Sequence, residues 1–364
     1  MAKRKSASKG YQSKGQRPNV RKDIRKAIRR DYVGSVEQMN NKVSAFKKGK
    51  RVMITVPNPN KIILKNDLFV FLCLLALLKM PEGPECTRVA RQLNRAVANK
   101  SLVSVNLLTG RYAKKTPVGF EEFVGTLPDT VRCVEVKGKF IYWKLNHHVI
   151  FSTLGMTGNY KITPNKYARV AFYFDDDSSV YYCDQRNFGT FKFLNDDYGL
   201  SELEKKLHKL GPDMLNNPCT QKTFNEIALR RKNWSLVKFL MHQESISGVC
   251  NIYKSESLYL AGLNPARKVG SLTVPELEKL YNAICKVLSA SYESGGATIR
   301  NYSDLYNNHG KYARFASNPQ EMLEARWDNK VMIYGRQQDI YGNIVQRIKL
   351  DDNRTTYWTP EVQR

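Results

Sequence analysis

A proline and a glutamate stand side by side at Pro81 and Glu82, inside the stretch "MPEGPE" that begins at Met80. A proline with a free amino group is a secondary amine whose pKa lies near the α-amino value of about 8, so it is readily deprotonated near neutral pH. Such an amine is a nucleophile of the Schiff-base type, and a neighbouring carboxyl whose pKa is raised by burial can transfer protons for it. An internal proline nitrogen is a tertiary amide without this reactivity. The pair therefore predicts chemistry only in a chain that begins at Pro81, as translation from Met80 and methionine removal would produce.

The segments that follow must position this pair. "PECTRVARQLNRAV" predicts a helix, because proline stands at its start, Glu85 lies in the first turn and Val89, Leu93 and Val97 share one face. Short alternating runs from "LVSVNLL" to "GTFKFL" predict a β-sandwich behind this helix. The fold class is thus α+β.

After Phe193 the periodicity becomes helical, as in "SELEKKLHKLG" and "NIYKSESLYLAG", with Gly211 and Gly262 where helices would end. The last stretch predicts strands around "KVMIYGR", "NIVQRIKL" and "TTYWTP", with a turn at Tyr341-Gly342-Asn343.

Composition narrows the class of partner. The 364 residues hold 59 Lys and Arg against 33 Asp and Glu, a net charge of +26, which favours nucleic acid first and a membrane surface second. The longest apolar run, residues 68–78, is far shorter than the roughly 20 residues that span a bilayer, so we expect no transmembrane helix. Among the partners we expect nucleic acid and no membrane. Seven cysteines without Cys-x-x-Cys spacing favour reduced thiols in an intracellular protein.

Four separated segments, in this order along the chain, resemble the formamidopyrimidine/endonuclease VIII (Fpg/Nei) family of DNA glycosylases. "MPEGPE" is similar to the amino-terminal motif of that family, "VKGKF" with "LGMTG" and "DQRNFG" to its sandwich motifs, and "SGVCNIYKSESLYLAGLNP" to its helix-two-turn-helix. Any single motif is more often an ordinary turn or core segment. All four in order are specific, and the resemblance covers about residues 80–364.

The resemblance implies a two-domain Fpg/Nei-like fold. Residues 80–200 would form the catalytic helix and β-sandwich, and residues 201–364 the helical domain with a zincless-finger β-hairpin at about 331–360. Residues 1–79 remain as a basic extension, disordered or absent from the active form. Within it, residues 20–31 have the pattern of a short basic amphipathic helix, which serves either as a solvated tail or as a nucleic-acid or nuclear-import arm.

The resemblance also implies a reaction and its catalytic residues. The expected activity is a bifunctional DNA glycosylase/AP lyase of base excision repair. Pro81 would attack C1′ of the damaged nucleoside and permit β,δ-elimination, Glu82 would protonate the opening sugar, and Lys139 of "VKGKF" would lie near the lesion phosphate.

Five further residues match DNA-binding positions of the family. Extracting a base from the duplex costs a few kcal/mol, and Met156, Arg186 and Phe188 match the residues that fill the resulting void. Asn251, at a predicted helix start, matches an asparagine that contacts phosphate, although Cys250 replaces the glycine expected before it. Arg354 matches an arginine at the tip of the finger hairpin.

No cofactor or metal is expected. No cysteine follows Cys285 and the histidines are dispersed, so a zinc finger is not predicted. The end of the chain instead resembles the zincless finger of Nei-like enzymes, which favours oxidised pyrimidines and hydantoins as substrates. The side chains expected to hold this hairpin by packing are those of Ile344, Ile348, Tyr357 and Trp358.

Two other functions compete with the enzyme. A catalytically blocked DNA-binding protein of the same fold would arise if the extension stays attached to Pro81. An RNA- or ribosome-associated protein would suit the basic tail, but it leaves "MPEGPE" and "DQRNFG" unexplained. We expect damaged DNA as the partner, a monomer without an obligate protein partner, and a location in the nucleus or at a viral or cytoplasmic replication site.

Overall fold

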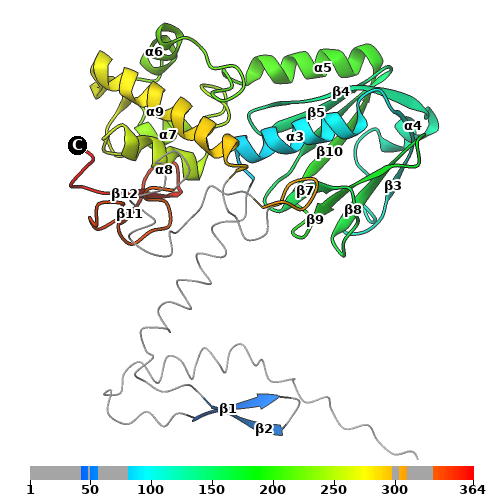
Figure 1. Cartoon of the computed structure of the whole chain (residues 1–364), viewed down its shortest axis with the longest axis horizontal. Helices are drawn as coiled ribbons and strands as arrows, with labels where there is room; N and C mark the ends of the chain where they lie inside the picture. Colours follow the sequence, from blue (N-terminus) through cyan, green and yellow to red (C-terminus); the bar gives the residue numbers. More distant parts are fainter. Residues whose placement is uncertain (1–41, 48–49, 56–80, 297–302, 310–330) are drawn as a thin grey trace, which may run out of the picture. The chain divides into compact units, whose positions relative to one another are not determined.

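The computed structural model describes five stretches of the chain (Figure 1), which are residues 42–47, 50–55, 81–296, 303–309 and 331–364. The chain divides into two compact units, residues 1–74 and 75–364. In the first unit, β1 (Lys42–Lys47) pairs antiparallel with β2 (Lys50–Thr55). Sequence analysis did not predict this hairpin. The expected disordered arm and basic helix lie outside the described residues.

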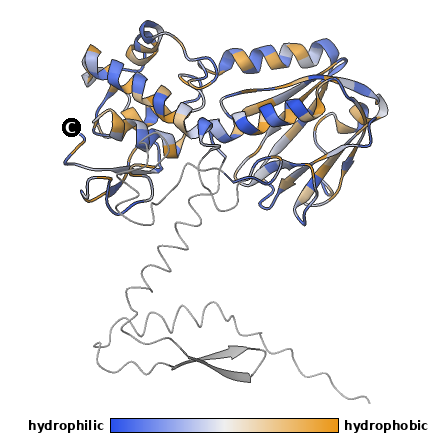
Figure 2. Ribbon diagram, in the orientation of Figure 1, coloured by the Kyte–Doolittle hydropathy of each residue, from blue (hydrophilic) through white to orange (hydrophobic). Residues whose placement is uncertain are grey.

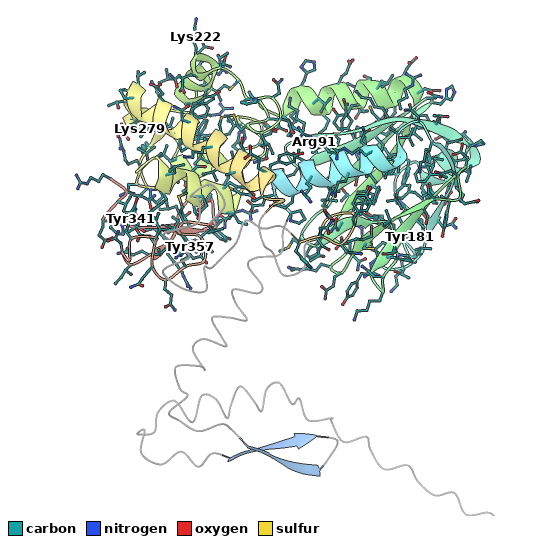
Figure 3. The ribbon with its side chains drawn as sticks, in the orientation of Figure 1. Arg91, Tyr181, Lys222, Lys279, Tyr341 and Tyr357 are labelled. Atoms are coloured by element: carbon teal, nitrogen blue, oxygen red, sulfur yellow. The ribbon has the colours of Figure 1, made fainter. Side chains whose placement is uncertain are left out.

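Helix α3 (Gly83–Val97) opens the described part of the second unit. Its first turn is closed by the Glu82 N–H, which donates to Glu85 Oε2 at 3.0 Å. Val89, Leu93 and Val97 are buried on one face, as predicted. The polar face continues to Arg91 (labelled in Figure 3), whose guanidinium donates to the Tyr292 hydroxyl of the last long helix at 2.7 Å. This bond ties α3 to α9 (Val274–Glu293).

Eight strands follow α3 and form a sandwich. They are β3 (Ser101–Leu107), β4 (Asp129–Lys137), β5 (Phe140–Leu145), β6 (His148–Thr153), β7 (Gly158–Lys161), β8 (Ala168–Phe174), β9 (Ser179–Asp184) and β10 (Thr190–Asn195), with the short helix α4 (Phe120–Gly125) before β4. The strand order is β10-β6-β5-β4-β3-β8-β9-β7. β3 and β4 pair only at Ser101–Thr130 and Leu102–Asp129, so two four-stranded halves meet at this corner.

Aromatic side chains fill the space between the two halves. Trp143 of β5 stacks on Phe172 of β8 with ring centroids 5.0 Å apart, and Tyr182 of β9 meets Phe191 of β10 edge to face at 4.8 Å. All four are buried. Hydrophobic and hydrophilic residues alternate along the strands (Figure 2), as expected when one face of each sheet is covered. The predicted sandwich is confirmed.

The second half of this unit is helical. Its helices are α5 (Asp196–Lys209), α6 (Gln221–Leu229), α7 (Leu236–Met241), α8 (Asn251–Leu260), the 3-10 turn η3 (Val269–Ser271) and α9 (Val274–Glu293). Helix α5 spans the predicted boundary between residues 200 and 201. Gly262 and Gly211 each follow the C-cap residue of a helix, α8 and α5, as predicted, but only Gly262 has the left-handed conformation, with φ of 70°. The Gly211 N–H instead donates to the Gln243 carbonyl at 2.9 Å, after α5 has ended in extended backbone.

The carboxyl-terminal hairpin pairs β11 (Gln346–Lys349) with β12 (Thr355–Trp358). The turn around Gly342 is present, with φ of 90°. The strand predicted at "KVMIYGR" is wrong for residues 331–336, because the backbone N–H groups of Met332, Ile333 and Tyr334 donate to the Glu256 carboxylate rather than to a neighbouring strand. Among the helices that the structure describes, none has the length and apolar character needed to cross a bilayer.

Candidate active site

Three glycines bring the sandwich and the helical half together. A Cβ on Gly83 of α3 would lie 2.5 Å from the Gly248 carbonyl oxygen, and one on Gly138 would lie 2.9 Å from the Gly248 nitrogen. Gly138 also has φ of 61°, and its N–H donates to Asp213 Oδ2 at 2.7 Å. The backbone of α3, the β4–β5 turn and the turn before α8 therefore pack directly against one another. This packing gathers residues 81–82, Lys139 and residues 250–251 at one point.

The carboxyl group of Glu82 lies at the centre of this cluster of residues. It is 2% exposed, and its oxygens accept from the Ile252 N–H at the start of α8 at 3.2 and 3.3 Å. Burial raises the pKa of Glu82 to about 8, against the opposing effect of Lys139. Glu82 is therefore a protonated acid at neutral pH. Pro81, which precedes it, is also buried.

Lys139 follows Gly138 in the β4–β5 turn, and its ammonium lies beside the Cys250 sulfur. The Cys250 sulfur and then the Glu82 carboxyl raise the pKa of Lys139, against the effect of burial. Burial raises the pKa of the Cys250 thiol to about 12, so this thiol is neutral. Sequence analysis did not predict that the side chains of Cys250 and Lys139 would contact each other. The backbone of Cys250 is extended, with φ of −140°, so its conformation does not call for a glycine.

The three residues predicted to fill the void in DNA come from two adjoining loops. Met156 lies in the loop 154–157 between β6 and β7, hereafter the Met156 loop, while Arg186 and Phe188 lie between β9 and β10. Thr157 Oγ1 joins the loops by donating to Asp184 Oδ1 at 2.5 Å and accepting the Arg186 N–H at 2.9 Å. The Arg186 guanidinium lies 4.9 Å from the centroid of the Phe188 ring, which is 50% exposed. Because the Phe188 ring is exposed and lies beside the Arg186 guanidinium, it suits insertion into a base stack better than it suits packing in the protein core.

Asn251 and Arg354 are linked through the finger hairpin. The Asn251 amide donates to the Tyr334 hydroxyl at 3.1 Å and to the Thr355 carbonyl at 3.2 Å. Arg354 is exposed, and its N–H donates to Asp352 Oδ1 at 3.1 Å. The first turn of α8 thus holds the hairpin close to its tip.

Buried charges complete this attachment. Lys254 Nζ of α8 lies 2.5 Å from Asp352 Oδ2, with the two side chains 0% and 3% exposed. Glu256 accepts from the N–H groups of Met332, Ile333 and Tyr334 at 2.6, 3.0 and 2.7 Å. Burial raises the pKa of Glu256 to about 7, against these three hydrogen bonds. Buried polar groups therefore attach the hairpin to α8 in addition to apolar packing, in which residues such as Ile333 and Tyr357 take part.

The expected packing of the hairpin is only partly correct. Tyr357 is buried, with its ring centroid 4.7 Å from that of Tyr334, but Ile344 is 66% exposed. Sequence analysis missed Lys254, Glu256 and Asp352. Charged residues in a helix usually face solvent, and nothing in "NIYKSESLYL" shows that Lys254 and Glu256 are buried instead. Asp352 likewise lies in a stretch that looks like an ordinary exposed turn. Within the described part of the chain, no three His, Cys, Asp or Glu side chains gather as a metal site would require.

Comparisons with known proteins agree with this arrangement. Residues 80–191 match the family model described as Formamidopyrimidine-DNA glycosylase N-terminal domain, and residues 210–303 match the Formamidopyrimidine-DNA glycosylase H2TH domain. The formamidopyrimidine-DNA glycosylase of Streptococcus pneumoniae is 30% identical over 291 residues, covering 78% of this chain and 99% of the relative. The chain belongs to the formamidopyrimidine-DNA glycosylase family.

Other relatives extend the match. The formamidopyrimidine-DNA glycosylase of Listeria monocytogenes is 28% identical over 78% of this chain and 100% of its own length. A solved complex of Lactococcus lactis Fpg with DNA that contains an abasic site has a TM-score of 0.64 and 25% identity, over 78% of this chain and 100% of that one. The predicted family and fold are thus confirmed, and this Fpg-family chain is a DNA glycosylase of base excision repair. The roles of the individual site residues stay predictions.

Proposed function

We propose that this chain is a bifunctional DNA glycosylase/AP lyase that binds damaged DNA and excises oxidised bases through a Schiff base on an N-terminal Pro81. The observation that carries the proposal is the buried Glu82 carboxyl, which keeps its proton at neutral pH directly beside Pro81. The family match begins at residue 80, which supports a catalytic chain that starts at Pro81.

The residues present suffice for each step. The lone pair of the Pro81 amine forms the bond to C1′, while the base leaves with the electrons of the N-glycosidic bond and takes up the proton that the Pro81 nitrogen gives up. Glu82 delivers its proton to the ring oxygen as the sugar opens and the iminium forms. The Glu82 carboxylate left by this transfer can accept the C2′ proton, whose loss expels the 3′ phosphate. A second elimination, which loses the C4′ proton to water, expels the 5′ phosphate. The ammonium group of Lys139, which lies near Glu82 and Cys250, suits a position beside a backbone phosphate.

The preferred lesion is part of the proposal. We favour oxidised pyrimidines and hydantoins, because the finger resembles the zincless Nei-like type. Solved complexes of the Lactococcus lactis protein contain Fapy-dG in one case and an oxidised pyrimidine in another. A panel of duplexes carrying an oxidised thymine, a hydantoin or a formamidopyrimidine would rank these substrates, and faster excision of the formamidopyrimidine would overturn our preference.

Borohydride trapping tests the nucleophile. A form beginning at Pro81 should give a covalent adduct with an oligonucleotide that contains an abasic site. The matched control adds one glycine before Pro81, which converts the amine into a tertiary amide and should abolish the adduct, as should the full chain. If the Pro81 form and the full chain both bind DNA, but neither is trapped and neither cuts DNA, the chain is instead a catalytically blocked DNA-binding protein.

We also propose that the protein acts as a monomer inside the cell, in the nucleus or at a viral or cytoplasmic replication site. The six cysteines that the structure describes are free thiols, which suits a reducing compartment. Sedimentation of the Pro81 form alone and with a lesion duplex tests the monomer, and imaging of the tagged protein tests the location.

A further inference from the structure

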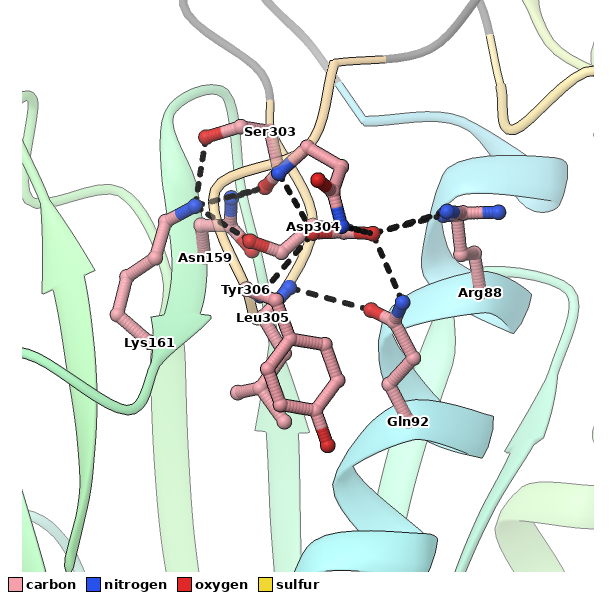
Figure 4. Close-up of polar contacts among 9 residues, drawn as sticks. Arg88, Gln92, Asn159, Lys161, Ser303, Asp304, Leu305 and Tyr306 are labelled. Atoms are coloured by element: carbon pink, nitrogen blue, oxygen red, sulfur yellow. Dashed lines mark hydrogen bonds and ion pairs between the residues drawn. The ribbon is translucent and has the colours of Figure 1, made fainter.

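A short segment between α9 and the finger hairpin, residues 303–309, carries a buried carboxylate that has no part in the proposed reaction (Figure 4). Asp304 is 0% exposed. Its carboxylate accepts from Arg88 Nη2 at 2.9 Å and from Gln92 Nε2 at 2.8 Å, both on α3, and from the N–H groups of Tyr306 and Asn308 at 3.0 and 2.8 Å. These bonds hold the pKa of Asp304 at about 2 although burial acts to raise it. The carboxylate is therefore an anion that fastens this segment to the catalytic helix.

The same segment is fastened on its other side to β7. Lys161 Nζ donates to Ser303 Oγ at 2.6 Å, to the Ser303 carbonyl at 3.0 Å and to the Asp304 carbonyl at 2.5 Å. The Asn159 amide also donates to the Ser303 carbonyl. Burial lowers the pKa of Lys161 to about 8, against the attraction of Asp304. We call Asp304 and the four side chains that hold its segment, those of Arg88, Gln92, Asn159 and Lys161, the Asp304 clasp.

The clasp joins two elements that both lead to the site. Helix α3 starts directly after Glu82, and β7 starts directly after the Met156 loop. Arg88 and Asn159 are separated from Glu82 and Met156 by only six and three residues along the chain. Hydrogen bonds in a buried network are directional, so they fix relative positions more tightly than apolar contacts do.

We propose that the Asp304 clasp positions the Met156 loop relative to Glu82, and so governs extraction of the damaged base. This inference rests on the proposed function. Because the Asp304 side chain is wholly buried, it acts as a positioning residue and does not touch DNA. Excision from an intact base stack needs the Met156 loop in place, whereas cleavage at a preformed abasic site has no base to extract. Loosening the clasp should therefore slow the first reaction more than the second.

The test compares Asp304→Asn with the unaltered Pro81 form in single-turnover assays. Asparagine keeps the shape but places an amide against the donors of Arg88 and Gln92. We expect excision of an oxidised thymine to slow by about ten- to 100-fold, the effect expected of a displacement near 1 Å, and abasic-site cleavage to change by less than about threefold. Asp176→Asn is the matched control, since Asp176 is an exposed sandwich carboxylate paired with Lys100 at 2.7 Å, and it should change neither rate. If Asp304→Asn does not fold, Gln92→Ala removes a single donor to Asp304 and should give the same pattern more weakly.

A second readout needs no activity. Hydrogen exchange in peptides covering residues 154–161 and 303–309 should quicken together in Asp304→Asn and remain unchanged in Asp176→Asn. Equal losses of both activities with a lower melting temperature would show that the clasp serves folding alone, and unchanged exchange in 154–161 would overturn the inference. If the unaltered Pro81 form excises no base, the proposed function fails, and the exchange data still decide whether the clasp holds the Met156 loop.

Discussion

Two buried glutamates lie at helix α8 in different surroundings. Glu256 is a residue of the helix, and Glu82 contacts its first turn. Glu82 accepts from the backbone N–H groups of Ile252 and Tyr253 at the start of α8, and it has Lys139 and Glu85 as charged neighbours. Glu256 accepts three backbone N–H groups from residues 332–334. Burial raises both pKa values, to about 8 and about 7. A raised pKa therefore does not identify a catalytic acid.

What separates the two carboxyls is the freedom of their neighbours. Beside its backbone donors, Glu82 has the titratable side chains of Lys139 and Glu85 as neighbours, whereas Glu256 accepts from three fixed backbone amides. The first arrangement suits chemistry and the second suits attachment of the hairpin. Four predictions test this division, beginning with the largest expected effect.

Glu82→Gln should slow base excision by about 10²–10⁴-fold, because it removes the proton that the opening sugar requires. Single-turnover excision by the Pro81 form measures the loss. Glu256→Gln is the matched control. Its folded molecules should excise the base with a rate constant close to that of the unaltered Pro81 form. Equal loss in both variants would contradict the division of roles.

Lys254→Met should destabilise the protein by about 3–5 kcal/mol, because it leaves the Asp352 carboxylate buried without its cation. Urea unfolding measures the change in the free energy of unfolding. Adding Asp352→Leu should restore part of it, since both buried charges are then gone. If Lys254→Met alone is as stable as the unaltered protein, the ion pair between Lys254 and Asp352 does not help to attach the hairpin.

The stability of the protein should also depend on pH through Glu82. Its pKa is about 8 in the folded protein against an ordinary 4.5, so the folded state holds a proton that the unfolded state releases. The favourable contribution is complete below about pH 4.5 and is lost as pH rises through 8, a change of a few kcal/mol at most. In Glu82→Gln this loss should vanish, so the variant should gain stability relative to the parent between pH 5 and 8. Parallel curves for the two proteins would contradict the raised pKa.

Arg354→Ala should have the smallest effect, because the side chain is exposed and its expected contact is a single phosphate. DNA affinity should weaken similarly for damaged and undamaged duplexes, and the slope of log affinity against log salt should fall by about one. Fluorescence anisotropy over a salt series measures both quantities. Lys349→Ala, a substitution in β11 of the same hairpin, is the control. A loss confined to the damaged duplex would contradict simple phosphate contact.

The sequence predicted what depends on local pattern. The apolar spacing of α3, the alternation of the strands and the order of the four motifs placed Pro81, Glu82, Lys139 and Asn251 in the right elements. It could not predict contacts between distant segments whose residue types are ordinary. Asp352 is 98 residues from Lys254, and Asp304 is 216 from Arg88. Each would be assigned to solvent without the fold.

The three glycines at the junction have a consequence for how this protein tolerates change. Even a methyl group on Gly83 or Gly138 would lie within 3 Å of the backbone of Gly248. A saturation mutagenesis scan would therefore rank these positions among the least replaceable, although they exchange no proton and carry no charge. The close approach of these backbone segments is set by where side chains are missing. Selection for new lesions must then act on residues that project from this frame, such as those of the Met156 loop, while the frame itself stays fixed.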